Sequence, residues 1–399
     1  MPALTGMRVL DMTQYEAGTS CTQFLAWLGA DVVKIESPQG DPGRIAFRRG
    51  TSDSQYFLNY NANKRSLVLD LSKPEGRDIF CRLVPRFNVF VENFGPGVIE
   101  KLGIGYEALR SLNPSIIYAR IKGFGGSGPY ADYKVFDPLA QAAAGIFSVT
   151  GEADGPPTQP GATLADSGTG AQMALAITAA FVQQQREGVG QLIDMSMQEA
   201  TLTFMKTRPV TEWNSGRPAQ RRGSAGGAPT GMYPCAPGGP NDYIYIHVAT
   251  TRMWDALCVA IGKPHLADDP RFATGRSRME NARLLRTEIE EWTMARSKFE
   301  AMHELAAADV PVSAIYDTVD VFSDPHLHAR GFFQKVDHPE AGEVLLMRSP
   351  LRLPESEVPL VRPPLLGEHS AEVLTQELGL TEADLQDLRE KCVIGGPPA

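Results

Sequence analysis

The sequence predicts an α/β protein with a doubly wound parallel sheet and a second, smaller domain. Three observations support this fold class. Short apolar strands alternate with helical segments through the first half of the chain. The first strand, helix and strand fit within about 30 residues, as one βαβ unit does. The total of 399 residues is enough for two or three packed units.

The first βαβ unit comprises a buried strand at 7–12, a helix at 22–29 and a strand at 31–36. Gly29 ends this helix, because glycine readily adopts the left-handed conformation of a C-terminal cap. No GxGxxG pattern follows the first strand, so a dinucleotide site is not predicted. The alternation continues with strands at 66–70, 88–93, 115–121 and 190–197, and with helices at 74–84, 99–112 and 171–185.

The pattern changes near residue 208, and this change sets the predicted domain boundaries. The large domain takes 1–207, a linker or binding loop rich in Gly, Pro and Arg takes 208–241, and the small domain takes 242–325. Residues 326–399 form a return segment and C-terminal helices. The elements expected in this half are a strand at 242–248 and helices at 253–261, 281–294, 370–378 and 381–391, the last with capping-box spacing between Thr381 and Asp384.

Composition and charge exclude several classes of function. The net charge is −9 and no basic stripe is present, which argues against nucleic-acid binding. No apolar run approaches the ~20 residues of a membrane span, and the N-terminus lacks the pattern of a secretory signal. The five cysteines are scattered without a CxxC pair, which favours a reducing, cytoplasmic location and argues against structural zinc. His303, His326 and His328 lack a metal-ligand pattern, so no metal site is predicted.

Asp166 is the strongest candidate for a catalytic residue. It lies among small residues at 161–171, just before an apolar helical run. A helix starting here would place free backbone N–H groups and the positive end of the helix dipole nearby. Such a carboxylate can stay ionised and still be reached by a substrate, as a nucleophile requires. The alternative interpretation is an ordinary N-cap aspartate.

Four patches follow predicted strands, where an α/β fold places its ligand contacts. Each combines glycine or another small residue with polar or cationic side chains, and glycine permits close approach of a ligand to the backbone. Arg65, Lys101 and Lys134 are candidates for binding phosphates, and Phe94 or Phe136 for packing on an adenine or a thioester arm. Taken singly, each patch is also compatible with a solvated turn. The patches are 14–18, 61–66, 92–98 and 122–137.

These segments together resemble one family, the class III CoA-transferases, which includes formyl-CoA:oxalate and carnitine CoA-transferases. The resemblance covers nearly the whole chain. It implies a large Rossmann-like domain built from both chain ends, a smaller central domain and an interlocked homodimer. The segments that carry it are 25–36, 63–66, 91–97, 123–125, 128–130, the Asp166 segment and 365–369.

The resemblance also implies a mechanism and a set of contacts. Asp166 would form a mixed anhydride with the donor acyl group, then an aspartyl-CoA thioester, and CoA would pass to an acceptor carboxylate. Coenzyme A is the substrate, and no metal or redox cofactor is implied. Asp137 would shape the acyl site. The implied CoA and substrate contacts are Glu16, Ala17, Arg65, Leu69, Asp70, Leu71, Ser72, Asn93, Phe94, Gly95, Lys101, Tyr133, Lys134, Val135, Phe136, Gly226 and Gly227.

Three positions depart from the formyl-CoA:oxalate pattern. Glu16 stands where those enzymes carry a glutamine, Ser37 replaces an arginine, and their glycine loop is reduced to 226–230. An anion at Glu16 would repel a small dianion, which weakens an oxalate assignment. Formate and oxalate, succinate, other short dicarboxylates and larger aryl or carnitine-like acids stay open as substrates.

Two other functions compete with CoA transfer. An α-methylacyl-CoA racemase needs acid/base groups on both faces of the α-carbon. Those enzymes supply a histidine before an aspartate where this chain has Phe136 and Asp137, and phenylalanine cannot carry a proton. A non-catalytic CoA-binding protein would not need an intact Asp166 among small residues. A covalent adduct on Asp166 would separate the transferase from both alternatives.

Overall fold

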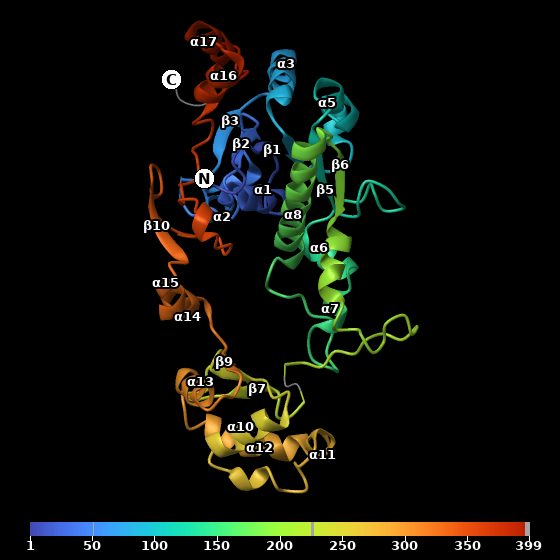
Figure 1. Cartoon of the computed structure of the whole chain (residues 1–399), viewed down its shortest axis with the longest axis vertical. Coiled ribbons are helices and arrows are strands. Elements are labelled where there is room, and N and C mark those ends of the chain that lie inside the picture. The colour runs from blue at the N-terminus through green and yellow to red at the C-terminus, as the bar shows by residue number, and fades with distance from the viewer. Residues whose placement is uncertain (51, 225–226, 396–399) are drawn as a thin grey trace. The chain divides into compact units, whose positions relative to one another are not determined.

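The computed structural model describes residues 1–50, 52–224 and 227–395. Two compact units make up the chain. The first combines residues 1–146, 159–210 and 330–399, and the second combines residues 147–158 and 211–329. Figure 1 shows the elements of each unit coloured along the chain.

A six-stranded parallel sheet forms the centre of the first unit, with strand order β3-β2-β1-β4-β5-β6. This confirms the α/β class and the parallel sheet. The strand order reverses between β1 and β4, and ligands of such sheets bind at the carboxyl ends beside this reversal. The strands are β1 (Arg8–Met12), β2 (Asp31–Glu36), β3 (Arg65–Val68), β4 (Val89–Glu92), β5 (Ile117–Lys122) and β6 (Leu192–Ser196).

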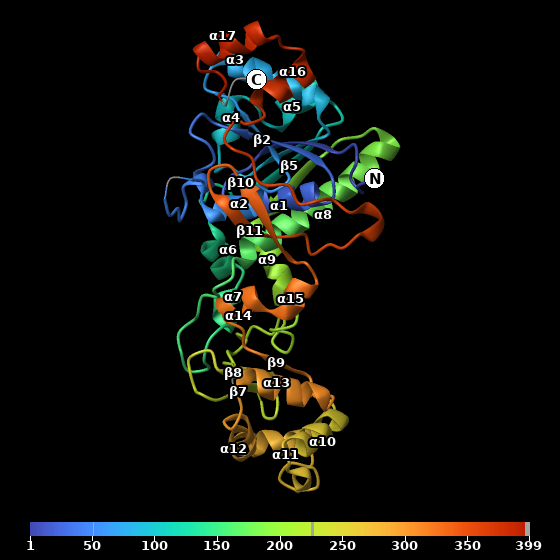
Figure 2. The same cartoon turned by 90° about the vertical axis from the view of Figure 1, so that its left-hand side faces the viewer.

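Helices cover both faces of this sheet. Val9 and Val91 face a core shared with α1 and α8, whereas Leu10 and Phe90 face a core shared with α3 and α16. Figure 2 shows α3, α5, α16 and α17 together, so segments from the two ends of the chain build one layer. These helices are α1 (Ala17–Trp27), α3 (Pro74–Leu83), α5 (Tyr106–Leu112), α8 (Leu164–Glu187), α16 (Ser370–Leu378) and α17 (Glu382–Glu390).

Shorter elements complete the first unit. A two-stranded antiparallel hairpin packs its Val344 and Leu346 against Phe57 and Leu58. The elements are α2 (Gln55–Asn61), α4 (Val98–Leu102), α6 (Asp137–Ala143), α9 (Met197–Leu202), β10 (Phe333–His338) and β11 (Gly342–Met347), and α7 (Ile146–Val149) follows α6.

The second unit has its own core beneath a three-stranded antiparallel sheet of order β7-β8-β9. Trp254, Ile289 and Leu305 are buried in it. The elements are β7 (Gly231–Pro234), β8 (Tyr243–Ile246), α10 (Thr251–Ala260), α11 (Gly275–Glu280), α12 (Ala282–Thr293), α13 (Lys298–Ala307), β9 (Val312–Ala314), α14 (Thr318–Ser323) and α15 (Pro325–Ala329).

Several predicted helix boundaries are wrong, for physical reasons. The helices predicted at 22–29 and 171–185 begin earlier, at Ala17 and Leu164, because their first turns bury small polar residues against each other and show no apolar periodicity. A Cβ on Gly170 would lie 2.0 Å from the Ser20 hydroxyl. The helix predicted at 99–112 is two helices, since Gly103 takes a left-handed φ of +72°. Helix α2 was not predicted, whereas the Thr381–Asp384 capping box is confirmed.

Within the described ranges, no helix combines the length and apolar character needed to cross a bilayer. The same ranges hold no group of three or more His, Cys, Asp and Glu residues arranged to bind a metal ion.

Candidate active site

A pocket of about 220 Å³ opens where β1 and β4 diverge at their carboxyl ends. Its walls come from the segments that follow β1, β4 and β5, and Asp166 of α8 lines it as well. The lining residues are Gln14, Tyr15, Glu16, Ala17, Asn93, Phe94, Gly95, Pro96, Ile121, Lys122, Gly123, Ala131, Tyr133, Lys134, Val135, Phe136, Asp166 and Met197.

Asp166 lies in the first turn of α8, but it does not cap the helix. Thr163 occupies the N-cap position, but its side chain makes no capping hydrogen bond to the helix backbone. Asp137, from the start of α6, does the capping instead. Its Oδ1 accepts hydrogen bonds from the backbone N–H groups of Ala165 at 2.9 Å and Asp166 at 3.0 Å. The N-cap interpretation of Asp166 is therefore wrong, and the expected free N–H groups are occupied.

Asp137 is itself held in place. It is buried, and Gln141 donates to its Oδ2 at 2.6 Å and to the carbonyl of Ala162 at 3.0 Å. The Asp137 carboxylate thus ties α6 to the first turn of α8. Asp137 fixes the backbone that carries Asp166, the nucleophile candidate, and Asp137 itself does not line the pocket.

Tight packing explains the small residues around Asp166. A Cβ on Gly168 would lie 2.5 Å from the ring of Phe204, and one on Gly170 would meet α1. The two helices α1 and α8 pack so closely at Gly170 that only glycine fits there, and at Gly168 a larger residue would displace the Phe204 ring. The small residues therefore also serve the core, and they leave the Asp166 side chain half-buried at the pocket wall.

Glu16 is the second acidic group in the pocket. It directly precedes α1, after Tyr15, whose backbone is left-handed with φ of 59°. Only 3% of Glu16 is exposed. Its Oε1 accepts hydrogen bonds from the Ser167 hydroxyl at 2.7 Å and from the Thr163 hydroxyl. These donors flank Asp166 in the sequence, so Glu16 is anchored to the same turn of α8.

The surroundings disfavour an ionised Asp166. Burial, followed by the charges of Glu16 and Asp137, raises the pKa of the Asp166 carboxyl to about 8. Among the residues the structure describes, none forms an ion pair with this carboxylate. A helix dipole contributes only about 0.3–1 kcal/mol at an exposed site, and burial next to two carboxylates outweighs it here. In the unliganded protein these surroundings oppose the ionised state of Asp166.

Residues at the rim of the pocket are held by defined contacts. The Asn93 side chain accepts from the backbone N–H of Gln14 at 2.8 Å and donates to its carbonyl at 2.9 Å. Lys122 lies 2.9 Å from Glu92 and donates to the carbonyl of Phe94 at 2.7 Å. Two exposed aromatic rings complete the rim: Tyr133, which contacts Phe124 and Tyr130, and Phe136, which packs edge-on against Tyr15.

Most residues predicted to contact substrate are brought together by the fold. Those in the pocket wall are Glu16, Ala17, Asn93, Phe94, Gly95, Tyr133, Lys134, Val135, Phe136 and Asp166. The sequence interpretation missed Gln141, Thr163, Ser167 and Tyr60. The Tyr60 hydroxyl lies beside the Glu16 carboxylate. Burial and the charge of Glu16 raise the pKa of this hydroxyl. Ser167 and Thr163 could have been found from their position next to Asp166, whereas Tyr60 lies on the unpredicted α2.

Other predicted contacts lie elsewhere. Arg65 begins β3, at the amino end of the sheet, and its guanidinium binds both oxygens of Asp31 at 2.8 Å and Glu372 at 2.8 Å. Arg65 therefore does not line the pocket, and the prediction that it contacts CoA there is wrong. Leu69, Asp70, Leu71, Ser72 and Lys101 follow β3 or lie on α4, outside the pocket wall. Gly227 belongs to the second unit, and Gly226 lies outside the described residues.

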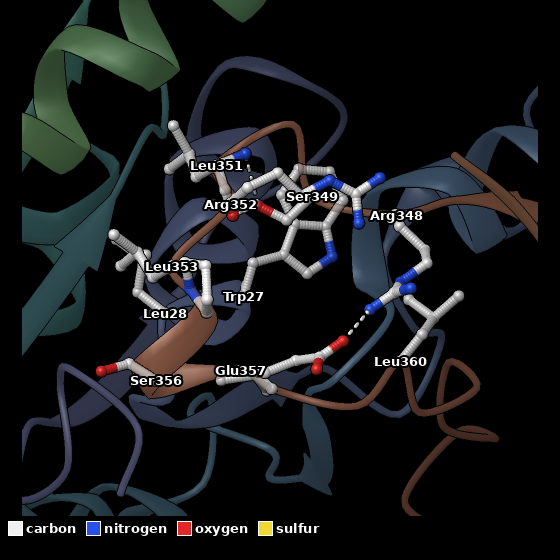
Figure 3. A pocket seen from close by; sticks show the side chains of 12 residues that line it. Trp27, Leu28, Arg348, Ser349, Leu351, Arg352, Leu353, Ser356, Glu357 and Leu360 are labelled. Atoms are coloured by element: carbon white, nitrogen blue, oxygen red, sulfur yellow. Dashed lines mark hydrogen bonds and ion pairs between the residues drawn. The ribbon is translucent and has the colours of Figure 1, made fainter. Parts of the chain in front are cut away.

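A second pocket of similar size lies between Trp27 and the segment 348–360 (Figure 3). The carboxylate of Glu357, which lines it, is 2.6 Å from the Arg348 guanidinium. The Ser349 hydroxyl accepts from the backbone N–H of Leu351 at 3.1 Å. Among the described residues, no Asp, Cys, His or Lys lines this cavity. The Asp166 pocket is therefore the better candidate for the active site.

Comparisons with known proteins identify the family of the chain. The profile of CoA-transferase family III matches residues 4–370. A formyl-CoA:oxalate CoA-transferase of Streptomyces avermitilis is 42% identical over 408 residues, covering 98% of this chain and 99% of that protein. One of Bradyrhizobium diazoefficiens is 37% identical, covering 99% and 98%.

Solved structures show the same relationship. A CaiB/BaiF family protein from Brucella suis superimposes with a TM-score of 0.83 at 34% identity, covering 93% of this chain and 98% of that one. A protein of Mycobacterium tuberculosis has a TM-score of 0.79 at 30% identity, covering 92% and 97%. The chain therefore belongs to CoA-transferase family III.

Proposed function

We propose that this CoA-transferase moves CoA from an acyl-CoA thioester to a carboxylic acid, with Asp166 as the nucleophile. One observation carries the proposal: Asp166 is a half-buried carboxylate with a raised pKa, in a pocket at the carboxyl ends of β1 and β4. The similar enzymes named formyl-CoA:oxalate CoA-transferase support thioesters and short acids as the substrates. Perturbed carboxyl groups in a cleft are typical of catalytic residues.

The chemistry balances with one carboxylate and no external reagent. An oxygen of Asp166 attacks the thioester carbon, the C–S bond breaks, and CoA leaves as a thiolate with the electron pair. The thiolate attacks the Asp166 carbonyl of the resulting anhydride and releases the donor acid. The acceptor carboxylate then attacks the carbonyl carbon of the aspartyl-CoA thioester, the C–S bond breaks, and CoA thiolate leaves a second mixed anhydride. The thiolate attacks the acceptor carbonyl of this anhydride, which forms the product thioester and releases Asp166 as a carboxylate. Each intermediate keeps its acyl group activated.

The pocket suits this chemistry in three ways. A carboxyl with a pKa of about 8 is a more basic oxygen nucleophile, when ionised, than one with an ordinary pKa near 4. The aromatic rim, with Tyr133 and Phe136, can cover a bound pantetheine arm and exclude water, which would hydrolyse the anhydride. Lys134 is an exposed cation at the same rim and supports attraction of the CoA phosphates.

A racemase is less well supported. Phe136 lines the pocket where a second acid/base group would be needed, and its side chain has no proton to exchange. Incubation of a branched acyl-CoA with the protein in D₂O gives the measurement that separates the two functions. We expect no deuterium at the α-carbon under conditions in which CoA is transferred.

We also propose that the chain acts as an interlocked homodimer in the cytoplasm, with a large Rossmann-like domain built from both chain ends. Leu175 and Val182 on α8 and Leu202 on α9 are large apolar side chains with 71%, 48% and 47% exposure, which supports a covered surface in an assembly. All five cysteines are free thiols, as in a reducing compartment. Differently tagged interlocked dimers should not exchange subunits until they are unfolded together.

Trapping the covalent intermediate tests the proposed mechanism. The intact protein is incubated with a panel of acyl-CoAs, quenched with hydroxylamine or borohydride, and analysed by mass spectrometry with peptide mapping. We expect a modification on Asp166. Asp166→Asn should lose transfer by at least about 10³-fold and still bind CoA, because its shape is unchanged but the nucleophilic oxygen is lost. Transfer by Asp166→Asn at the parental rate would contradict the mechanism.

A further inference from the structure

Glu16 places a second fixed negative charge at the reacting end of the pocket. Its carboxylate is buried, and Ser167 and Thr163 hold it through their hydroxyl groups. Both donors belong to the turn that carries Asp166, so Glu16 cannot move away without breaking these bonds. Asp137 adds a third carboxylate behind the same turn. An acid that reaches Asp166 therefore enters a region already surrounded by negative charge.

The cations of the pocket do not offset this charge. Lys122 is engaged by Glu92 at 2.9 Å and by the carbonyl of Phe94. Lys134 is exposed at the rim. These two lysines are the only cations in the wall of the pocket as the structure describes it, and neither forms an ion pair with Glu16 or Asp166. A second carboxylate on a bound acid would find no partner beside Asp166.

We propose that Glu16 determines the class of acid, so that the acyl site takes monocarboxylic acids whose other end is uncharged and disfavours dicarboxylates such as oxalate. This inference rests on the proposed function, since it concerns the acid that exchanges on Asp166. It differs from the acceptor named for the similar enzymes, and it assigns the difference to one side chain.

Electrostatics gives the expected size of the preference. The reacting carboxylate is common to both kinds of acid, so its repulsion from Glu16 cancels in a comparison. The second carboxylate of oxalate adds one full charge a few Å from Glu16. At roughly 6 Å and an effective dielectric constant of about 20, that repulsion corresponds to about 100-fold in binding, and salt reduces it toward about 10-fold. A hydroxyl in the same place carries no charge and can donate a hydrogen bond.

Matched acids and matched variants test the inference. Glycolate and oxalate have nearly equal size, and 4-hydroxybutyrate and succinate form a second pair. We expect kcat/KM for the hydroxy acid to exceed that for the dicarboxylate by about 10–100-fold in the parent protein. Glu16→Gln should bring the ratio to within about threefold of one, by raising use of the dicarboxylate. Glu343→Gln makes the same change on the exposed β10–β11 hairpin and should keep the parental ratio.

The outcomes separate this inference from the proposed function. A parent protein that labels Asp166 yet uses oxalate as well as glycolate, or an unchanged ratio in Glu16→Gln, overturns the inference alone. A parent protein that never labels Asp166 overturns the proposed function and this inference with it. If Glu16→Gln does not fold, calorimetry on Asp166→Asn saturated with CoA decides. Weaker binding of oxalate than of glycolate supports the inference, and equal or tighter binding of oxalate overturns it.

Discussion

Two clusters of buried charge lie near the carboxyl ends of β1 and β2, and they are built in opposite ways. In the first, every carboxylate faces a cation, with Lys64 3.1 Å from Asp11, Lys34 2.8 Å from Asp41 and Arg44 2.7 Å from Glu36. The second contains carboxylates alone. We call them the paired network (Asp11, Lys34, Glu36, Asp41, Arg44 and Lys64) and the acidic cluster (Glu16, Asp137 and Asp166).

The carboxylates of the two clusters respond differently to burial. Burial alone would raise the pKa of Asp11, but Lys64 and Lys34 hold it below its ordinary value. In the acidic cluster burial acts together with neighbouring carboxylates, and the pKa of Asp166 rises to about 8. Charge pairing therefore decides whether a buried carboxylate is part of the framework or a reactive group. Asp11 and Glu16 are close in the sequence, yet Asp11 belongs to the paired network and Glu16 to the acidic cluster.

Removing one partner from the paired network should produce the largest change in stability. Lys64→Met leaves Asp11 buried without its cation, and we expect the free energy of unfolding to fall by about 3–5 kcal/mol. Denaturant unfolding of the full chain measures this loss. The double variant Asp11→Leu/Lys64→Met removes both charges and should recover at least half of it, with the rest lost at Thr13 and Thr22, which donate to Asp11. A single variant as stable as the parent would contradict the assignment.

The sheet and the pocket could be predicted from the sequence because their signals are local. Apolar strands alternate with helices in chain order, and each strand is followed by the polar or glycine-rich segment that lines the pocket. Parallel strands bring those segments to one edge whatever their separation in the chain. This is why Glu16, Asn93 and Lys134 were identified together with Asp166.

The contacts that give these residues their properties are not local, and so they could not be predicted. Lys64 and Asp11 are 53 positions apart, and nothing in either segment identifies the partner. Asp137 was expected in the acyl site, but it caps α8 from α6, which depends on the tertiary packing of two helices. The early starts of α1 and α8 were missed because small residues that pack closely leave no apolar period.

The acidic cluster should lower stability, and removing a charge there should raise it. The ordinary pKa of an aspartyl group is 3.8 and that of folded Asp166 is about 8, so between these pH values the unfolded chain releases a proton that the folded chain retains. The free energy of unfolding of the parent therefore falls with pH across this window and is level above it. The full pKa shift would lower the free energy of unfolding by about 5–6 kcal/mol. Because Asp166 is half-buried and solvent screens its charge, we expect the free energy of unfolding to fall by about 1–3 kcal/mol.

Asp166→Asn lacks this penalty, and it should be more stable than the parent by that amount at pH 8.5. The two proteins should be equally stable near pH 4. Urea unfolding of both proteins at the two pH values measures the difference. A variant that is less stable than the parent at pH 8.5 would show that Asp166 has a stabilising partner when ionised, and would place it with the paired network.

The rate of adduct formation should report the same carboxyl group. Only the ionised form of Asp166 attacks, so the rate constant for labelling by a saturating acyl-CoA should rise with pH and level off above about 8. Glu16→Gln removes one neighbouring charge and should lower the midpoint by about one pH unit, equal to about 1.4 kcal/mol. Rapid quench and intact-mass analysis across pH 5–10 gives both curves. Coincident midpoints would mean that Glu16 carries no charge next to Asp166.

The comparison between paired and unpaired charges also applies to cations. Here we expect the smallest effect, which is a change in CoA affinity. Arg65 is paired with Asp31 and Glu372 at the amino end of β3, whereas Lys134 lies exposed at the rim of the Asp166 pocket. Lys134→Gln should weaken CoA binding by about two- to fivefold at low salt, the size of one exposed charge contact, and the effect should shrink as salt increases. Arg65→Gln should change CoA affinity by less than about twofold, because its guanidinium is already bound at the other end of the sheet. Calorimetric titration with CoA at two ionic strengths distinguishes the two residues. A larger loss in Arg65→Gln would mean that an ion-paired side chain can still serve the ligand, and pairing alone would no longer separate framework charges from functional ones.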